Sequence, residues 1–243
     1  MSRLADIRAK SRLRDILEGQ PQHIGMAVFM ACGAVFLLRE GFGPDQYTPL
    51  GLDAARWAMI GIAFAILHQV IVAIGFRLQL HCNLLSRLFG RWDMAIWAAL
   101  FMPLLVARPV FVSLVGWTDS VPITESRGVE IALGLALLAP AIWGMHSVLV
   151  HFTIPRAFGG DHFRDEIAAL PLVSKGVFRY VDNAMYGVVF LGLWGIALLF
   201  GSWNALILAA FQHAYIWVHM YTVEGPDMAW IYGDRVEAES EQG

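Results

Sequence analysis

The polar side chains that could take part in proton transfer gather in the last third of the chain. Asn204, Gln212 and His219 follow one another at spacings of eight and seven residues, which places them on one face of a helix. Glu224 comes directly after that helix. Polar groups inside an apolar helix can face a cavity or join neighbouring helices by hydrogen bonds. The spacing therefore predicts either a polar pocket or a set of helix–helix contacts.

A second group of polar residues lies in the segment 151–183, which is amphipathic and rich in arginine. Within it, Gly159 and Gly160 stand beside Asp161 and His162. Composition alone favours a connector in the headgroup layer of a membrane, where basic side chains would face anionic lipid. The alternative is that this segment contributes side chains to a site.

Three further ionisable residues lie within apolar segments. For His68 and His146, each isolated in its segment, we expect a core histidine with its hydrogen bonds satisfied. Arg108 precedes Pro109 deep in another segment and needs a carboxylate or carbonyl partner, because an unpaired charge is costly there.

Several chemistries lack their signatures. The sequence contains no HExxH, GxSxG, CxxC, GxGxxG or Walker motif, so it predicts no metal site and no soluble-type nucleotide domain. The only cysteines, Cys32 and Cys82, are too few for a disulfide framework or a thiolate metal site. The net charge of −3 indicates no nucleic-acid partner.

The composition is that of a membrane protein. Hydrophobic residues make up 58% of the chain and charged residues 15%, whereas soluble domains carry about a quarter charged residues. The mean hydropathy is +0.58. The fold class predicted is all-α: a polytopic integral membrane protein of about six transmembrane helices. The last two form a tight hairpin broken at Gly201-Ser202-Trp203-Asn204, and the apolar segments are 23–38, 56–76, 94–116, 129–150 and 184–221.

Lys and Arg residues alternate between the two sides of these segments. Thirteen of the 17 lie in the amino-terminal segment, in the second and fourth loops or in the tail. Arg39, Arg56 and Arg127 lie on the opposite side. Because cytoplasmic loops carry the excess of positive charge, we expect both termini and the segment 151–183 in the cytoplasm.

Three motifs follow one another in the last part of the chain. Residues 160–163 (GDHF) resemble the G-D-Y/H-F motif of the phosphatidylethanolamine N-methyltransferase group. Residues 176–187 (GVFRYVDNAMYG) resemble that group's D-N-P-M-Y-x-G signature, and residues 223–233 (VEGPDMAWIYG) resemble its E-E-P-x-M…Y-G element. The related isoprenylcysteine carboxyl methyltransferase group usually has Arg-His where this chain has Asp182-Asn183. The chain departs from the pattern at Ala184, in place of proline, and at Gly225, in place of the second glutamate.

The resemblance implies a methyltransferase that binds S-adenosylmethionine at the cytoplasmic end of the last helices. Glu224, His162 and His219 would be the candidate proton acceptors for a lipid ammonium. The acceptor implied is the amine of phosphatidylethanolamine and of its methylated intermediates, toward phosphatidylcholine. The residues implied to bind the methyl donor are Gly159, Gly160, Asp161, Arg179, Tyr180, Asp182, Asn183, Tyr186, Glu224 and Tyr232.

Other functions stay open at this point. The same donor site could serve an isoprenylcysteine carboxylate, a small thiol or another lipophilic amine. A non-enzymatic, haem-binding or quinone-binding protein would instead use the histidines of the apolar segments. The predicted organisation is a cytoplasmic amphipathic segment at 1–22, three amino-terminal spans within 23–127, a methyltransferase-like core at 128–234 and a disordered tail at 235–243.

Overall fold

The computed structural model describes residues 2–40 and 48–240, with side chains up to Gly233. The described residues form helices and no strand; Pro122 and Ser202 make an isolated bridge. The predicted all-helical class is therefore confirmed for this part of the chain.

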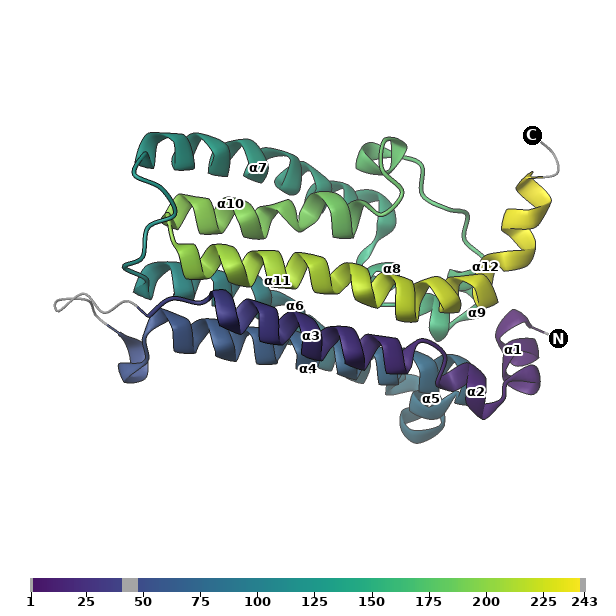
Figure 1. Ribbon diagram of the computed structural model, residues 1–243. Helices are drawn as coiled ribbons and strands as arrows, with labels where there is room; N and C mark the ends of the chain where they lie inside the picture. The colour runs from purple at the N-terminus through teal and green to yellow at the C-terminus, as the bar shows by residue number, and fades with distance from the viewer. Residues whose placement is uncertain (1, 41–47, 241–243) are drawn as a thin grey trace.

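The apolar segments form a bundle of helices that run side by side (Figure 1). Three of these helices have a π-helical turn next to the cavity described below: η3 (Val148–Phe152), η6 (Met185–Val189) and η7 (Met220–Glu224). The helices of the bundle are α3 (Gln20–Leu37), α4 (Ala54–Cys82), α6 (Asp93–Thr118), α7 (Arg127–Ser147), α10 (Leu191–Phe200) and α11 (Trp203–His219). Each corresponds to one of the predicted segments.

Three helical stretches are long and apolar enough to cross a membrane: Ala54–Cys82, Leu84–Thr118 and Arg127–Phe152. A fourth apolar helix, Met185–Phe200, is shorter. Large apolar side chains cover the outside of the bundle; Phe29, Phe36 and Ile142 are 73%, 86% and 66% exposed. Such a surface is stable only against lipid or another apolar partner. The structure thus supports a membrane protein, while the count of six spans stays a prediction.

The predicted hairpin break is present between α10 and α11. Gly201 adopts a φ of +68°, which only glycine tolerates at low cost, and the Ser202 side chain accepts a hydrogen bond from the Ala205 amide to cap α11. Asn204 then donates to the Arg39 carbonyl and to Asp119. At this end of the polar face, the helix-contact interpretation holds.

Short helices gather at the end of the bundle where both termini lie, called the capped end here (Figure 1). Three single-turn helices lie with them: η2 (Gly90–Trp92), η4 (Gly160–His162) and η5 (Gly176–Arg179). A further one, η1 (Pro49–Gly51), lies at the opposite end of the bundle. The short helices are α1 (Arg3–Lys10), α2 (Leu13–Ile16), α5 (Leu84–Phe89), α8 (Ile154–Ala157), α9 (Asp165–Ala168) and α12 (Gly225–Ser240).

The amino terminus is part of this cap. Leu4 and Ile7 of α1 are 0% and 2% exposed and pack in one apolar cluster with Ile231 and Tyr232 of α12. Arg3 donates to the Trp230 carbonyl at 2.6 Å. The amphipathic segment predicted at 1–22 therefore covers the last helix. That helix runs to Ser240, into the tail predicted to be disordered, and residues 241–243 lie outside the described residues.

Candidate functional site

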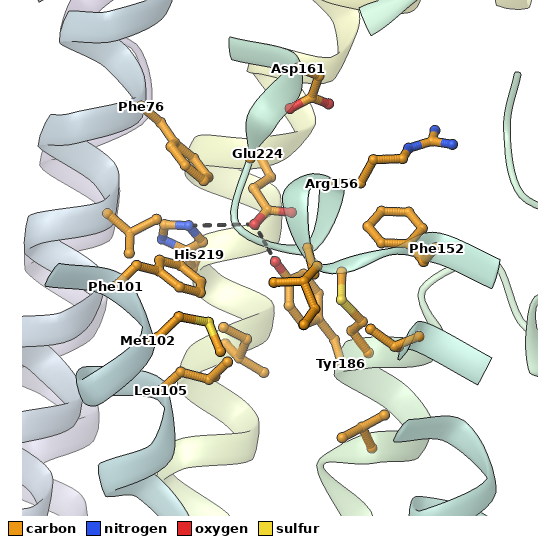
Figure 2. Close-up of a pocket in the computed structure, with 18 of the residues that line it drawn as sticks. Phe76, Phe101, Met102, Leu105, Phe152, Arg156, Asp161, Tyr186, His219 and Glu224 are labelled. Carbon is orange, nitrogen blue, oxygen red and sulfur yellow. Dashed lines mark hydrogen bonds and ion pairs between the residues drawn. The ribbon is translucent and has the colours of Figure 1, made fainter. Parts of the chain in front are cut away.

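A cavity of about 230 Å³ opens inside the bundle, next to the capped end (Figure 2). Its walls come from α4, α6, α7 with η3, the segment 154–162, η6, α11 with η7, and α12. Most of the lining is apolar, as Phe101, Met102, Leu105 and Phe152 show. Its polar side chains lie at two ends: Glu224, Asp161 and Arg156 toward the cap, and Arg108 and His68 toward the middle of α6 and α4. A mainly apolar pocket with a few convergent polar groups is the usual form of a small-molecule site.

Glu224 is the carboxylate at the centre of the first polar end. The π-turn η7 follows α11 without a break and carries Glu224 into the cavity, where the Tyr186 hydroxyl donates a hydrogen bond to its Oε1 atom. Nε2 of His219 lies 3.8 Å from the same oxygen. Figure 2 shows these three side chains converging from two elements that lie far apart in the sequence. Of the polar residues on the α11 face, His219 therefore lines a pocket, as one of the two interpretations predicts.

The position of Glu224 changes its acidity. Burial raises the pKa of this carboxyl group to about 7, although the hydrogen bond from Tyr186 opposes the rise. A general base works best when its pKa lies near the working pH. Glu224 can therefore gain and lose a proton in the neutral range.

His162 occupies the wall between the cavity and the cap. Its Nδ1 lies 2.9 Å from Asp161 and its Nε2 lies 3.2 Å from Asp227, and the Phe76 ring stacks on it at 4.2 Å between centroids. Burial by itself lowers the pKa of His162, but the two carboxylates outweigh burial and raise the pKa to about 10. His162 is thus an imidazolium near neutral pH, which donates two hydrogen bonds and is a poor proton acceptor. Of the three predicted bases, Glu224 fits that role best.

The same network fastens the cap to the bundle. Asp227 of α12 is 0% exposed and pairs with Arg77 of α4 at 3.0 Å. Arg77 also donates to backbone carbonyls of the amino-terminal segment and of η7, among them Asp15 and Thr222. Tyr232 completes the cluster by donating to Asp161 at 2.9 Å. Every charged group of this network, called the cap network here, faces an opposite charge or a hydrogen-bond partner.

Arg108 stands at the other end of the cavity, in α6. Its Nε donates to Nδ1 of His68 at 3.1 Å, and its guanidinium lies 5.5 Å from the centroid of the Phe190 ring. The expectation of a carboxylate or carbonyl partner is therefore wrong: the partner is an imidazole. The expectation of a core histidine is also wrong for His146, which is exposed, and holds for His68 only at Nδ1, because Nε2 has no partner.

The two adjacent glycines serve close packing. Gly159 adopts a φ of +81°, and a Cβ atom there would lie 2.4 Å from the Phe76 ring. A Cβ on Gly160 would lie 2.5 Å from the Pro155 carbonyl oxygen. Only Gly159 lines the cavity. Gly159 thus lets the segment 154–162 approach α4 and brings His162 against Phe76, while Gly160 lets that segment fold closely on itself.

The cavity brings together seven of the residues predicted from the sequence, and the other five, Gly160 among them, lie outside its lining. Arg179, Tyr180 and Asp182 are exposed, and Asn183 is half-buried. Their role in donor binding stays a prediction. The seven that line the cavity are Gly159, Asp161, His162, Tyr186, His219, Glu224 and Tyr232.

Sequence reasoning missed several residues of the site. Asp227 and Met228 lie three and four residues after Glu224, a helical spacing that could have indicated them. Arg77 and Phe76 carry no such signal, because their partners lie about 150 and 86 residues away along the chain. The cavity also draws on α4 and α6, so the predicted core at 128–234 does not enclose the site by itself.

Fold and site together define a helical membrane protein with an ionisable pocket near one end of its bundle. Within it, residues 129–235 match the family described as phospholipid methyltransferase. The resemblance predicted from the three motifs is thereby confirmed for this segment. The match begins after α6, so α3, α4 and α6 lie outside it.

Curated relatives show the same similarity. Phosphatidylethanolamine N-methyltransferase of Scheffersomyces stipitis is 31% identical over 106 residues, which is 43% of this chain and 12% of the relative. The enzyme of that name from Laccaria bicolor is 33% identical over 141 residues, 54% of this chain and 15% of the relative. The aligned part of this chain thus spans only about an eighth of these relatives' length. No solved structure matches the chain.

Proposed function

We propose that this chain is a membrane-embedded methyltransferase that transfers a methyl group from S-adenosylmethionine to the amine of a membrane phospholipid. The acceptors are phosphatidylethanolamine and its methylated intermediates, toward phosphatidylcholine. The observation that carries the proposal is the contact between Tyr186 and Glu224 inside the cavity. Each residue comes from one of the motifs on which the resemblance rests, and both lie within the matched segment.

The residues of the polar end fit the methyl donor chemically. The donor carries a sulfonium, an ammonium, a carboxylate and an adenine, which lipid cannot solvate. Glu224 and Asp161 supply negative charge toward the cationic groups, and Tyr186 and Phe152 supply aromatic faces for the adenine. Arg156, over the Phe152 ring at 5.0 Å, supplies positive charge for a carboxylate. When bound, the donor supplies an activated methyl group.

The protein's own residues then align the acceptor and take up its proton. A lipid ammonium is not a nucleophile until it loses a proton. Glu224 can accept that proton, since its pKa of about 7 leaves much of it ionised at neutral pH. The hydrogen bond from Tyr186 fixes the orientation of the carboxylate. Alignment of the two reactants supplies much of the remaining rate enhancement.

The lipid acceptor explains the apolar middle of the cavity. Met102 and Leu105 of α6 line it together with Met145 of α7 and Leu149 of η3. Met145 and Leu149 are also 43% and 52% exposed on the outside of the bundle. Acyl chains can therefore stay in the bilayer and reach the cavity from the side. We propose that the capped end faces the cytoplasm, because the segments at this end carry most of the Lys and Arg residues.

The experiment is methyl transfer in a defined membrane. Purified protein is reconstituted into vesicles that contain phosphatidylethanolamine and supplied with methyl-labelled S-adenosylmethionine. The proposal predicts label in phosphatidyl-N-methylethanolamine and its further methylated products. Label that appears only in an added isoprenylcysteine, thiol or single-chain amine would overturn the choice of acceptor. No label in any acceptor, with no binding of the donor, would overturn the proposed function.

A further inference from the structure

One wall of the cavity comes from α4 and α6, which lie outside the matched segment. In α6, Phe101, Leu105 and Arg108 recur at helical spacing and line the cavity together. His68 of α4 also lines the cavity. Its ring packs edge-on against the Phe101 ring, with 5.1 Å between the centroids. These two helices therefore contribute an arginine and a histidine that the motifs of the carboxyl-terminal part do not include.

Arg108 has hydrogen-bond donors to spare. It is 4% exposed, and both Nη1 and Nη2 are buried without a partner among the described residues. No carboxylate among the described residues forms an ion pair with Arg108. Arginine stays protonated in proteins, so a permanent charge lies within the apolar bundle. An arrangement of this kind is costly unless an anion joins it.

The hydrogen bond to His68 adds a third donor. Because the Arg108 Nε always carries a hydrogen, the Nδ1 atom of His68 must be the acceptor. The proton of the neutral ring is then on Nε2, which is buried and also lacks a partner. Two guanidinium nitrogens and one imidazole nitrogen therefore form a set of unused N–H donors at this end of the cavity.

The carboxylates of the cavity lie at one end and its unpaired arginine lies at the other. Glu224 and Asp161 lie toward the cap together with the cations Arg156 and His162, whereas the described lining around Arg108, toward the middle of α6, holds no carboxylate. Tyr186 links the two ends, since it donates to Glu224 and lies within electrostatic range of Arg108. A cationic group is favoured near Glu224 and repelled by Arg108, whereas an oxyanion is favoured near Arg108.

We propose that Arg108 and His68 bind the phosphodiester of the acceptor phospholipid, while the amine of the same headgroup points toward Glu224. This inference rests on the proposed function and assigns a binding site to α4 and α6. A guanidinium fork matches two phosphate oxygens, and the His68 Nε2–H supplies a further hydrogen bond. The carboxylate of the methyl donor is the other oxyanion that could occupy this site, and the experiment separates the two.

The experiment measures binding to purified protein in detergent micelles. Tryptophan fluorescence follows titration with dioctanoylphosphatidylethanolamine and with dioctanoylglycerol, which lacks the phosphate. Calorimetry follows S-adenosylmethionine. The variant is Arg108→Gln, and the control is Arg87→Gln, an exposed arginine of α5. Since charge-assisted hydrogen bonds are the strong ones, we expect Arg108→Gln to weaken phospholipid binding by about 30-fold. Dioctanoylglycerol and donor affinities should stay within about twofold.

Other results would overturn the assignment. Unchanged phospholipid affinity in Arg108→Gln would remove the site, and a selective loss of donor affinity would place the donor carboxylate there. If Arg108→Gln does not fold, Arg108→Lys and His68→Asn carry the test. Each should weaken phospholipid binding by about fivefold, and unchanged binding in both overturns the inference. Phospholipid binding that depends on Arg108, in a protein that methylates no lipid, would refute the proposed function and leave this site standing.

Discussion

The cap network and the cavity hold similar side chains in opposite circumstances. In the cap network, Arg77 and His162 each face Asp227, and all three are nearly inaccessible. In the cavity, Glu224 contacts a tyrosine hydroxyl and lies 3.8 Å from an imidazole. Two nitrogens of Arg108 have no partner among the residues that the structure describes. The first set of charges is neutralised within the protein, and the second is not.

This difference separates structural charges from ligand-binding charges. Paired groups tie together segments far apart in the sequence: Arg77 alone joins α4 to the amino-terminal segment, η7 and α12. Unpaired buried groups cost free energy that a ligand can recover. The comparison therefore assigns folding to the Arg77–Asp227 pair of the cap network and chemistry to Glu224 and Arg108 of the cavity. It predicts that substitutions of the two kinds will have different effects.

The largest effect on stability is expected from Asp227→Ala. The substitution leaves Arg77 buried without its counter-charge, which typically costs about 3–5 kcal/mol. Thermal unfolding in detergent measures the loss. Glu18→Ala is the matched control, because Glu18 approaches the same arginine at 4.0 Å but is 53% exposed, and exposed pairs contribute less than about 1 kcal/mol. If both variants unfold alike, the cap network does not hold the fold.

Glu224→Gln should separate activity from stability. We expect methyl transfer to fall by about 10²- to 10⁴-fold, the usual contribution of a positioned base, while the melting temperature stays at or above that of the parent protein. The physical reason is that the substitution removes a buried ionisable group that has no counter-charge. Glu166→Gln, an exposed carboxylate of α9, is the control. A Glu224→Gln protein that melts early with its remaining activity intact would assign Glu224 to the fold.

The pH dependence of transfer sharpens the role of Glu224. The carboxylate must be ionised to accept a proton, so the rate should rise as the pH rises through about 7. The Tyr186 hydrogen bond stabilises the ionised form and lowers this pKa. Tyr186→Phe should therefore move the inflection upward by about one pH unit, the equivalent of one hydrogen bond. A shift downward, or a profile without an inflection between pH 6 and 9, would argue against Glu224 as the base.

The smallest effect is expected at Asn183. The side chain does not line the cavity and is only half-buried, so Asn183→Ala should weaken donor binding by about threefold or less, corresponding to less than one net hydrogen bond. Calorimetry with S-adenosylmethionine measures this. A loss as large as that of Glu224→Gln would show that Asn183 contacts the donor, as the motif resemblance implies.

Local patterns predicted the helices and the hairpin well. Each apolar segment became a helix, because spacing and turn residues act over only a few positions; Gly201 and Ser202 end one helix and cap the next. The cap was only partly predicted. The amphipathic pattern at 1–22 indicates a buried face, but its partners lie in α4, α9 and α12, at least 70 residues away along the chain, and cannot be read from local spacing.

For the site, the sequence indicated the residue types better than their partners. His219 came from one helix face, and Tyr186 and Glu224 came from two motifs; the structure places the three side chains together. Arg108 was recognised as a charge in need of a partner, but a partner 40 residues away in a different helix cannot be read from spacing. Likewise, His162 was predicted as a base, and only the surrounding carboxylates show why it keeps its proton.

The central claim is that the Glu224 end of the cavity holds the methyl donor, and calorimetry tests it most directly. Purified parent protein, Glu224→Gln and Glu166→Gln are each titrated with S-adenosylmethionine in the same detergent. We expect saturable one-site binding for the parent protein and for Glu166→Gln, and a loss of at least about tenfold in affinity for Glu224→Gln, as expected for a buried charged contact. Equal affinity in all three proteins, or no binding by the folded parent protein, would contradict the account.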